Sequence, residues 1–464
     1  MCFIKKNLKS FIYLLSFLAL VFITMAIANG IQKDFGKIDV SMGTFETEYE
    51  TIEGETKSGT VAYKLYVPKT ATATNKAGAV LLLHGYQNDH ETSAAYALEL
   101  ARRGLVVLAA DEFGHGATNI SMVNRGYVSH KVKVNYGNES EEDYVEIGGP
   151  ERYKVMMNFS NMSFFLDKYS KDDEGNQILD SSMGGVALYG FLSGLPYVDN
   201  QRMAVSGHSM GTWAAWSVSA AYSGETIEPK ATILQAGELF TRDAYDDNNI
   251  HFNNVLLLTA KWDEFNMFRD YSKQTVNDSI IENELSSEFL GVSLGTGKWN
   301  KTYGDFNNGS ARRRELVKTN HRLLTHNKKA IATTIDWLDQ AIDVTTSLKD
   351  SNQVFMIKET LVLVATFAAI ASMFALFTIL IKIPFFKTIA HPEIISERAG
   401  SVKTGWHWWK GAIITIMIAG LTYPFMTQLG HGLLPLPEKS VFRMTIGNGF
   451  LSWYLCLIII MLLT

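Results

Sequence analysis

Cysteine is almost absent from this chain of 464 residues, which contains only two. Cys2 and Cys456 lie near the two ends, so the long region between them cannot contain a disulfide. A domain of that size buries enough apolar surface to be stable without one. An excess of charge is also missing, because 42 Lys and Arg residues against 47 Asp and Glu residues give a net charge of -5. This balance gives no reason to expect nucleic acid as a partner.

Two further patterns are missing. No pair of histidines and acidic residues has the spacing of a metal site, so we predict no metal and no other cofactor. The apolar stretches near the C-terminus contain no acid or histidine that would mark a proton or ion path, apart from His431 near the end of one of them. We therefore predict that these stretches act mainly as an anchor.

Apolar residues concentrate instead in four uncharged stretches near the two ends of the chain. About 20 apolar residues span a bilayer, and the four candidates are Phe11–Gly30, Thr360–Ile381, Gly411–Gly430 and Gly449–Thr464. For the first stretch the alternative is a cleaved signal peptide, with "AIANG" as its cleavage site. The sequence stops within the fourth stretch, so we expect either a minimal helix or a truncated chain there.

Basic residues beside these stretches predict how the protein is oriented. Three lysines precede the first stretch, and five Lys and Arg residues lie between the second and the third, at Lys382, Lys387, Arg398, Lys403 and Lys410. Because basic residues collect on the cytoplasmic side of a membrane, we expect both segments in the cytoplasm. The prediction is an anchor at 1–30, an extracytoplasmic domain at 31–353 and a membrane domain of three helices at 354–464, in the cell membrane.

The central region alternates short apolar runs with helical patterns. "TFETEYETIEG" and "GTVAYKLYVP" predict two strands joined by a turn. "AGAVLLLHGY" and "LVVLAAD" are continuous apolar runs, typical of strands buried on both faces, and the helical stretch "ETSAAYALELARRG" separates them. "RMAVSGH", "KATILQAG", "NNVLLLTAK" and "RRELVKTN" continue the series. We therefore predict an α/β fold with a mostly parallel sheet and helices on both faces.

Residues with reactive side chains follow the ends of these predicted strands. In such sheets, ligands bind beyond the carboxyl ends of the strands. Ser209 follows "RMAVSGH", Asp263 comes after "NNVLLLTAK", and His321 comes after "RRELVKTN". A serine, an acid and a histidine therefore emerge, in that order, at one edge of the sheet.

Ser209 also lies in a glycine pattern of its own, within "VSGHSMGTWAA". Gly207 and Gly211 flank it at the spacing of a sharp strand-to-helix elbow, where glycines keep side chains out of a crowded turn. The alternative is an ordinary glycine-rich bend. The strand before the serine and the helix after it favour the elbow, and with it a nucleophilic serine.

With these residues in place, the chain resembles the α/β-hydrolases. The segment Leu188–Gly211 resembles the helix, turn, strand and elbow of dienelactone-hydrolase-like and prolyl-oligopeptidase-like members. "LLLHGY" resembles their oxyanion loop, and "DEFGHG" resembles the Asp-x-x-Gly-His-Gly turn after the next strand. The resemblance covers residues 43–345 and implies the α/β-hydrolase fold and serine hydrolase activity.

The same resemblance implies roles for individual residues. Ser209 would be the nucleophile, His321 its base, and Asp263 the acid that orients the imidazole. The backbone N–H groups of Tyr86 and Met210 would form the oxyanion hole.

Several of these assignments have rivals. Glu264 stands beside Asp263, and His326 follows His321 by five residues. We favour the first of each pair because its position relative to the strand end fits better. Three further histidines, His84, His115 and His208, lie in or next to glycine turns, and we predict that they are structural.

Two long connections lie near the predicted site. Between Ala117 and Ser182, "RYKVMMNFSNMSFFLDKYS" has apolar residues at helical spacing, which predicts either a lid over an apolar pocket or an ordinary packed helix. Between Ser279 and Gly304, Phe289 or Trp299 could reach the pocket rim.

The leading functional prediction is a membrane-anchored serine hydrolase that cleaves an acyl ester of a small-molecule or lipid-like substrate. A peptidase or an acyltransferase of the same fold is the enzymatic alternative. The non-enzymatic alternative is a binding domain carried on a membrane module.

Overall fold

The computed structural model describes most of the chain, namely residues 3, 7–51, 55–120, 124–127, 131–133, 144–146, 182–237, 239, 251–264, 279–344, 348–387, 405–433 and 445–463. The chain divides into two compact units. One unit is Phe22–Ala365, and the other combines Met1–Val21 with Thr366–Thr464. The first unit contains the sheet and all the predicted site residues.

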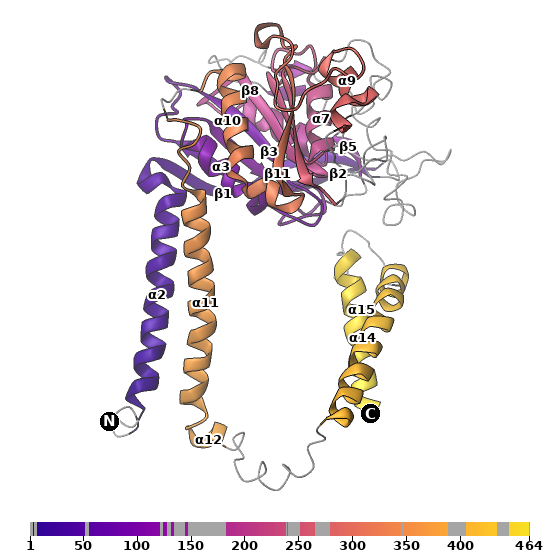
Figure 1. The fold of residues 1–464 in the computed structure, drawn as a ribbon. Coiled ribbons are helices and arrows are strands. Elements are labelled where there is room, and N and C mark those ends of the chain that lie inside the picture. The colour runs from indigo at the N-terminus through magenta and orange to yellow at the C-terminus, as the bar shows by residue number, and fades with distance from the viewer. Residues whose placement is uncertain are drawn as a thin grey trace. The chain divides into compact units, whose positions relative to one another are not determined.

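A nine-stranded sheet forms the centre of the unit Phe22–Ala365, in the order β11-β10-β9-β8-β3-β4-β2-β1-β5 (Figure 1). The six strands from β11 to β4 run parallel, whereas β2, β1 and β5 continue the sheet antiparallel. The strands are β1 Ile38–Thr51, β2 Thr56–Pro68, β3 Ala77–Leu83, β4 Val106–Ala110, β5 Asn124–Tyr127, β8 Val198–His208, β9 Ala231–Gln235, β10 Val255–Trp262 and β11 Arg312–Asn320. A separate two-stranded sheet pairs β6 Lys131–Lys133 with β7 Tyr144–Glu146.

Helices cover both faces of this sheet. The helices are α3 Ala94–Ala101, α6 Gly185–Ser193, α7 Gly211–Ala221, α9 Glu284–Leu290 and α10 Lys328–Ile342. Successive side chains of a strand point to opposite faces. Leu81 and Leu83 of β3 accordingly belong to a core that includes residues of α6 and α7, whereas Val80 and Leu82 belong to a core that includes residues of α3 and α10. A strand buried on both faces needs a continuous apolar run, which explains the sequence "AVLLL".

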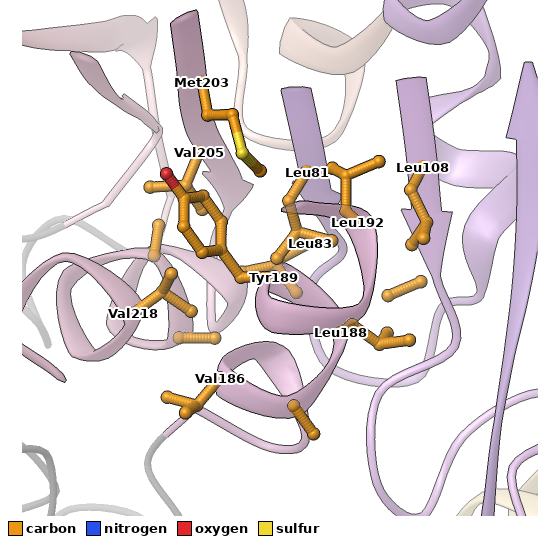
Figure 2. Close-up of a cluster of buried hydrophobic side chains, with 14 of the residues drawn as sticks. Leu81, Leu83, Leu108, Val186, Leu188, Tyr189, Leu192, Met203, Val205 and Val218 are labelled. Carbon is orange, nitrogen blue, oxygen red and sulfur yellow. The ribbon is translucent and has the colours of Figure 1, made fainter. Parts of the chain in front are cut away.

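The core on the α6 and α7 side is built around an aromatic ring. Tyr189 of α6 lies against Met203 and Val205 of β8, with Val218 of α7 beside it (Figure 2). The buried hydroxyl of this tyrosine donates a hydrogen bond to the carbonyl oxygen of Ile227, at 3.0 Å. Burying one such large side chain stabilises the fold by about 1.5–3 kcal/mol.

The predicted fold is confirmed. A mostly parallel sheet with helices on both faces, and a strand-to-helix turn at its centre between β8 and α7, is the α/β-hydrolase architecture expected from the sequence. All the predicted strands form, although their ends differ by a few residues from the apolar runs. For example, β10 begins at Val255, two residues into the run "NNVLLLTAK", directly after Asn254 with its positive φ of 42°.

Among the described residues, three helices are long and apolar enough to cross a membrane. They are α2 Leu8–Gln32, α11 Phe355–Leu380 and the part Trp408–Thr427 of α14 Trp406–Leu433. A shorter apolar stretch, Gly449–Leu462, lies in α15 Thr445–Leu463, where we expected a fourth, incomplete span. Within their own unit α14 and α15 pack together, and the indole N–H of Trp453 lies 3.2 Å from the carbonyl oxygen of Ala419. A further short helix, α12 Pro384–Lys387, follows α11.

Candidate active site

The three predicted catalytic side chains lie at one edge of the sheet. Ser209, Asp263 and His321 each directly follow the last residue of a parallel strand, which is β8, β10 and β11 respectively. Neighbouring parallel strands end at the same edge, so the three residues share the carboxyl edge of the sheet. The register of β10 and β11 pairs Trp262 with Asn320, which brings the residues after them together.

Ser209 occupies a strained turn. Its φ of 57° lies in the left-handed region, which residues other than glycine rarely adopt. A Cβ atom built on Gly207 would lie 1.8 Å from the carbonyl oxygen of Gly211, and one built on Gly211 would lie 2.3 Å from the carbonyl oxygen of His84. No side chain fits at either glycine. The pattern therefore forms a sharp strand-to-helix elbow rather than an ordinary bend.

Hydrogen bonds hold the backbone of this elbow. The N–H group of Ser209 donates to the carbonyl oxygen of Gln235 in β9, at 2.9 Å. The carbonyl oxygen of Ser209 accepts from the hydroxyl of Thr212 at 2.6 Å and from its N–H group at 3.0 Å. Both sides of the strained peptide are thus fixed, and strain of this kind persists only where the surrounding structure enforces it.

His321 is in direct contact with Asp263. The Nδ1 atom of His321 lies 3.0 Å from each carboxylate oxygen of Asp263, and the two side chains are 7% and 6% exposed. An acceptor-only carboxylate requires a proton on Nδ1. In a neutral imidazole this leaves Nε2 as the basic nitrogen, so the contact selects one tautomer.

The rival residues take other positions. The ring of His326 packs against Phe355, with ring centroids 6.4 Å apart, and its Nδ1 atom lies 2.9 Å from the hydroxyl of Thr325. Glu264 accepts a hydrogen bond from the backbone N–H of His321, at 3.4 Å, rather than from its ring. The structure thus brings Asp263 and His321 together through their side chains, and neither rival takes part in that contact.

His208 supports the histidine that follows β11. Its Nε2 atom lies 3.0 Å from the carbonyl oxygen of His321, and the two rings are 4.9 Å apart. This bond links the end of β8 to the residue after β11. The predicted structural role of His208 therefore has a concrete form, which is to hold the backbone of His321.

The loop after β3 lies against the elbow. A Cβ atom built on Gly85 would lie 2.8 Å from the Cβ atom of Ser209. Tyr86, one of the two predicted oxyanion donors, follows this glycine, and its carbonyl oxygen accepts a hydrogen bond from the side chain of Asn88, at 3.2 Å. Met210, the other predicted donor, follows Ser209 directly and precedes α7, where backbone N–H groups favour negative charge.

His84 and His115 support this loop as neutral rings. The Nε2 atom of His84 accepts a hydrogen bond from the N–H of Glu112, at 3.1 Å, and that of His115 accepts from the N–H of Gln87, at 3.0 Å. Burial lowers the pKa of His84 to about 3 and also lowers the pKa of His115. Rings that accept hydrogen bonds and stay neutral fit the predicted structural role.

The sequence did not draw attention to His90, which lies at the end of the same loop. Its Nδ1 atom lies 2.6 Å from Oδ1 of Asp111, the first residue after β4. Hydrogen bonds to Asp111 and Glu91 raise the pKa of His90 to about 9 against the opposing effect of burial. The only signal available in the sequence was the position of Asp111 at a strand end, and its partner could not be identified from that.

The predicted insertions are described in part. The stretch "RYKVMMNFSNMSFFLDKYS", predicted as a lid or a packed helix, lies outside the described residues. Phe289 of α9 is partly buried against the core that contains α6 and α7. Trp299 lies under the guanidinium group of Arg314, 5.1 Å from the ring centroid. Both aromatic rings therefore contribute to packing within their own domain.

Among the described residues, no group of three or more His, Cys, Asp and Glu side chains could hold a metal ion.

No protein-family model matches the chain, and no curated protein matches its sequence. Similar solved structures include a protein assigned as a dipeptidyl aminopeptidase IV from Bacteroides ovatus, with 12% identity, 66% of this chain and 36% of that chain covered, and a TM-score of 0.34. The match thus spans about a third of that chain's length.

Two shorter proteins are also similar. An S-formylglutathione hydrolase from Agrobacterium tumefaciens has 16% identity, with 65% of this chain and 96% of that chain covered, and a TM-score of 0.36. A dienelactone hydrolase-like promiscuous phosphotriesterase from metagenomic libraries has 12% identity, with 70% and 99% covered, and a TM-score of 0.34. The fold assignment rests on the strand order and the elbow described above.

Proposed function

We propose that this protein is a membrane-anchored serine hydrolase that cleaves an acyl ester through an acyl-enzyme formed on Ser209. The contact between Nδ1 of His321 and both carboxylate oxygens of Asp263 supports this proposal most strongly. An acid in this position orients the imidazole and stabilises its protonated form. Ser209, on its strained elbow at the same sheet edge, is the nucleophile.

The proposed reaction begins with acylation of the serine. Ser209 Oγ bonds to the acyl carbon while Nε2 of His321 takes the hydroxyl proton. The backbone N–H groups of Tyr86 and Met210 stabilise the oxyanion, and loss of one such donor commonly reduces kcat by about 100- to 1,000-fold. The bond to the leaving alcohol then breaks, and His321 returns the proton to the alcohol oxygen.

Deacylation repeats the same steps with water. His321 takes a proton from the water as its oxygen bonds to the acyl carbon, and the second oxyanion occupies the same hole. Collapse of this intermediate breaks the bond to Ser209 Oγ, which regains its proton. The products are a carboxylic acid and an alcohol.

An apolar acyl group is the proposed substrate class. Trp262, directly before Asp263, is 60% exposed, and Leu323, two residues after His321, is 57% exposed. Trp262 pairs in register with Asn320, and the side chain of Asn320 accepts a hydrogen bond from the N–H of Leu323. Both apolar residues are therefore next to the ends of the strands that position Asp263 and His321. Exposed apolar residues gathered around a reactive centre favour an apolar or lipid-like ligand.

The membrane helices and the flanking basic residues support a location for the enzyme. We propose that residues 31–353 work outside the cytoplasm and that α2, α11 and the C-terminal helices hold them at the cell membrane.

Hydrolysis assays on the full chain in detergent test the proposed activity. The substrates are p-nitrophenyl butyrate, p-nitrophenyl palmitate and a peptide p-nitroanilide. We expect the wild type to cleave the esters and Ser209→Ala to lose on the order of a millionfold in kcat. The matched control is Ser58→Ala, which changes an exposed serine on β2.

Other outcomes of the same assays separate the alternatives. Cleavage of the anilide in preference to the esters would replace the esterase proposal with a peptidase. Release of nitrophenol accompanied mainly by transfer of the acyl group to an added alcohol would indicate an acyltransferase. No turnover by a folded wild type would favour the non-catalytic binding domain.

A further inference from the structure

Two segments at the carboxyl edge of the sheet are tied together. We call residues 84–90, after β3, the oxyanion loop, and residues 111–117, after β4, the clasp segment. Three hydrogen bonds donated by backbone N–H groups join the oxyanion loop to the clasp segment. They join Glu112 N–H to His84 Nε2 at 3.1 Å, Gln87 N–H to His115 Nε2 at 3.0 Å, and His90 N–H to Asp111 Oδ1 at 2.9 Å.

The contact at His90 is reinforced by charge. In addition to the backbone bond, Nδ1 of His90 lies 2.6 Å from Oδ1 of Asp111. The other oxygen of Asp111 accepts a hydrogen bond from the N–H of Ala117, at 2.8 Å, which fixes the carboxylate within the clasp segment. The side chain of Asp111 is 1% exposed and that of His90 is 12% exposed. Charge-assisted hydrogen bonds shielded from water are among the strongest in proteins.

The oxyanion loop also contacts the nucleophile. Gly85 approaches Ser209 so closely that an added Cβ atom would lie 2.8 Å from the serine Cβ. The N–H group of Tyr86 belongs to the next residue of this loop. A small displacement of the loop therefore changes the distance between this N–H group and any oxyanion formed at Ser209.

We propose that His90 and Asp111 are positioning residues, whose ion pair holds the oxyanion loop at the distance from Ser209 that catalysis requires. The proposal rests on the proposed hydrolase function, because it assigns the pair a role in that reaction. Neither side chain is proposed to touch the substrate. The pair acts through the backbone of the loop.

Several charged and titratable groups surround His90. Glu91, the next residue, lies 3.4 Å from Nε2 of His90 and also pairs with Lys64 of β2. Lys358 of α11 acts on Glu91 electrostatically, and Asp111 acts electrostatically on the rings of His84 and His115, whose pKa values are lowered by burial. The acids are closest to His90, so the local charge favours an imidazolium.

The pKa directions agree with this arrangement. Hydrogen bonds to Asp111 and then to Glu91 raise the pKa of His90 to about 9, although burial opposes the shift. Burial disfavours the charged form of Asp111, but its bonds from His90 and from backbone N–H groups outweigh that effect and lower its pKa. The hydrogen bond from His90 also helps lower the pKa of Glu91 to about 2.

The direction of the His90 shift determines the expected pH dependence. A pKa raised above the unfolded value means that the ion pair stabilises the loop fully below about pH 6.5. This stabilisation is lost as the pH rises through about 9, where His90 releases its proton. We therefore expect kcat of the wild type to fall on the alkaline side near pH 9.

Two substitutions at His90 separate its bond from its charge. His90→Ala removes both, and we expect kcat to fall by about 10- to 100-fold with KM unchanged, since displacement by about 1 Å can reduce a rate roughly 100-fold. His90→Asn keeps an N–H donor close to the position of Nδ1 but cannot ionise. Because it lacks the charge, its kcat at pH 7 should already be as low as that of the wild type above pH 9, and the decline near pH 9 should be absent. The matched control is His251→Gln, which changes an exposed histidine.

Hydrogen exchange of the backbone amides of residues 84–91 tests the clasp without any catalysis. We expect slow exchange in the wild type and His251→Gln, and faster exchange in His90→Ala. If the wild type hydrolyses no ester but shows this exchange pattern, the proposed hydrolase activity is wrong, whereas the role of His90 and Asp111 in holding the oxyanion loop is supported.

Two results would overturn the inference. If the amides of residues 84–91 exchange as slowly in His90→Ala as in the wild type, the pair does not hold the loop. Faster exchange with unchanged kcat and an unchanged pH profile would mean that the loop position does not matter for the reaction. Should His90→Ala fail to fold, the comparison of His90→Asn with the wild type across pH 6–10 decides the same question.

Discussion

At the scale of single residues, the sharp turn at Ser209 depends on the glycines at positions 207 and 211. The glycines on either side are required by contacts of 1.8 Å and 2.3 Å that any Cβ atom would make. Such contacts depend on a sharp turn, which a five-residue pattern already implies. The positions of Asp263 and His321 could be predicted for a related reason, since each directly follows a predicted strand.

The partnership of His90 with Asp111 could not be predicted in this way. The two residues are 21 positions apart, and a hydrogen bond across that distance depends on how two loops fold over one sheet edge. Periodicity identifies strands and helices, but it contains no information on the path of a loop. From the sequence we predicted both loops and a structural role for His84 and His115, but not the contact between His90 and Asp111.

The choice between Asp263 and Glu264 is testable by matched substitutions. Asp263→Asn keeps the size of the side chain but offers His321 an amide, which permits the wrong tautomer. We expect kcat to fall by about 10,000-fold, as is typical when a triad acid becomes an amide. Glu264→Gln should reduce kcat by less than about 10-fold, because Glu264 contacts the backbone N–H of His321 and not its ring.

Ester hydrolysis at saturating substrate measures both changes. A larger loss in Glu264→Gln than in Asp263→Asn would reverse the assignment of the acid.

At the scale of secondary structure elements, α3 secures the start of α11. Glu99 of α3 is buried, and its Oε1 atom accepts hydrogen bonds from the N–H groups of Val354 and Phe355, at 2.6 Å and 2.9 Å. Arg103 pairs with Glu99 and donates to the carbonyl oxygens of the chain that precedes α11, at Lys349, Asp350 and Asn352. An acid at a helix N-terminus satisfies N–H groups that lack partners within the helix.

Substitution of Glu99 should therefore weaken the folded domain. Glu99→Gln leaves the buried guanidinium of Arg103 without its acid, and breaking such a pair typically destabilises a protein by about 3–5 kcal/mol. Thermal unfolding of the full chain in detergent measures the effect, with the exposed Glu284→Gln as the control. Equal unfolding temperatures for both variants and the wild type would show that this network does not stabilise the domain.

The apolar runs predicted β3 and β4 well because both strands are buried on both faces. β3 and β4 contain only buried residues, so their sequences are apolar throughout. The network at the start of α11 was not predicted, because Glu99 looks like any charged residue of an amphipathic helix. Its burial depends on a segment more than 240 residues further along the chain.

At the scale of the whole molecule, the order of strands and helices could be predicted, and the location of the protein remains a proposal. Alternating strands and helices leave few possible topologies, because crossovers in parallel sheets are right-handed. Helices of sufficient length and apolarity identify candidate membrane spans, and the flanking basic residues are the basis for the proposed side of the membrane.

Labelling of a single cysteine tests the proposed side of the membrane. Cys2 and Cys456 are replaced by serine, and an exposed lysine of the domain at 31–353 is changed, as Lys298→Cys. We expect a membrane-impermeant maleimide to label this protein in intact cells, because residues 31–353 are proposed to lie outside the cytoplasm. The control is Lys387→Cys, beyond α11, which should react only after the membrane is permeabilised. The opposite pattern would invert the topology.

The central claim is that Ser209 is an activated nucleophile. The most direct measurement is labelling of membranes with a fluorophosphonate probe, followed by mass spectrometry of the labelled peptide, for the wild type and Ser209→Ala. We predict a covalent adduct on Ser209 in the wild type and none in the variant. An unlabelled but folded wild type, or equal labelling of both proteins, would contradict the claim that this serine is the catalytic nucleophile.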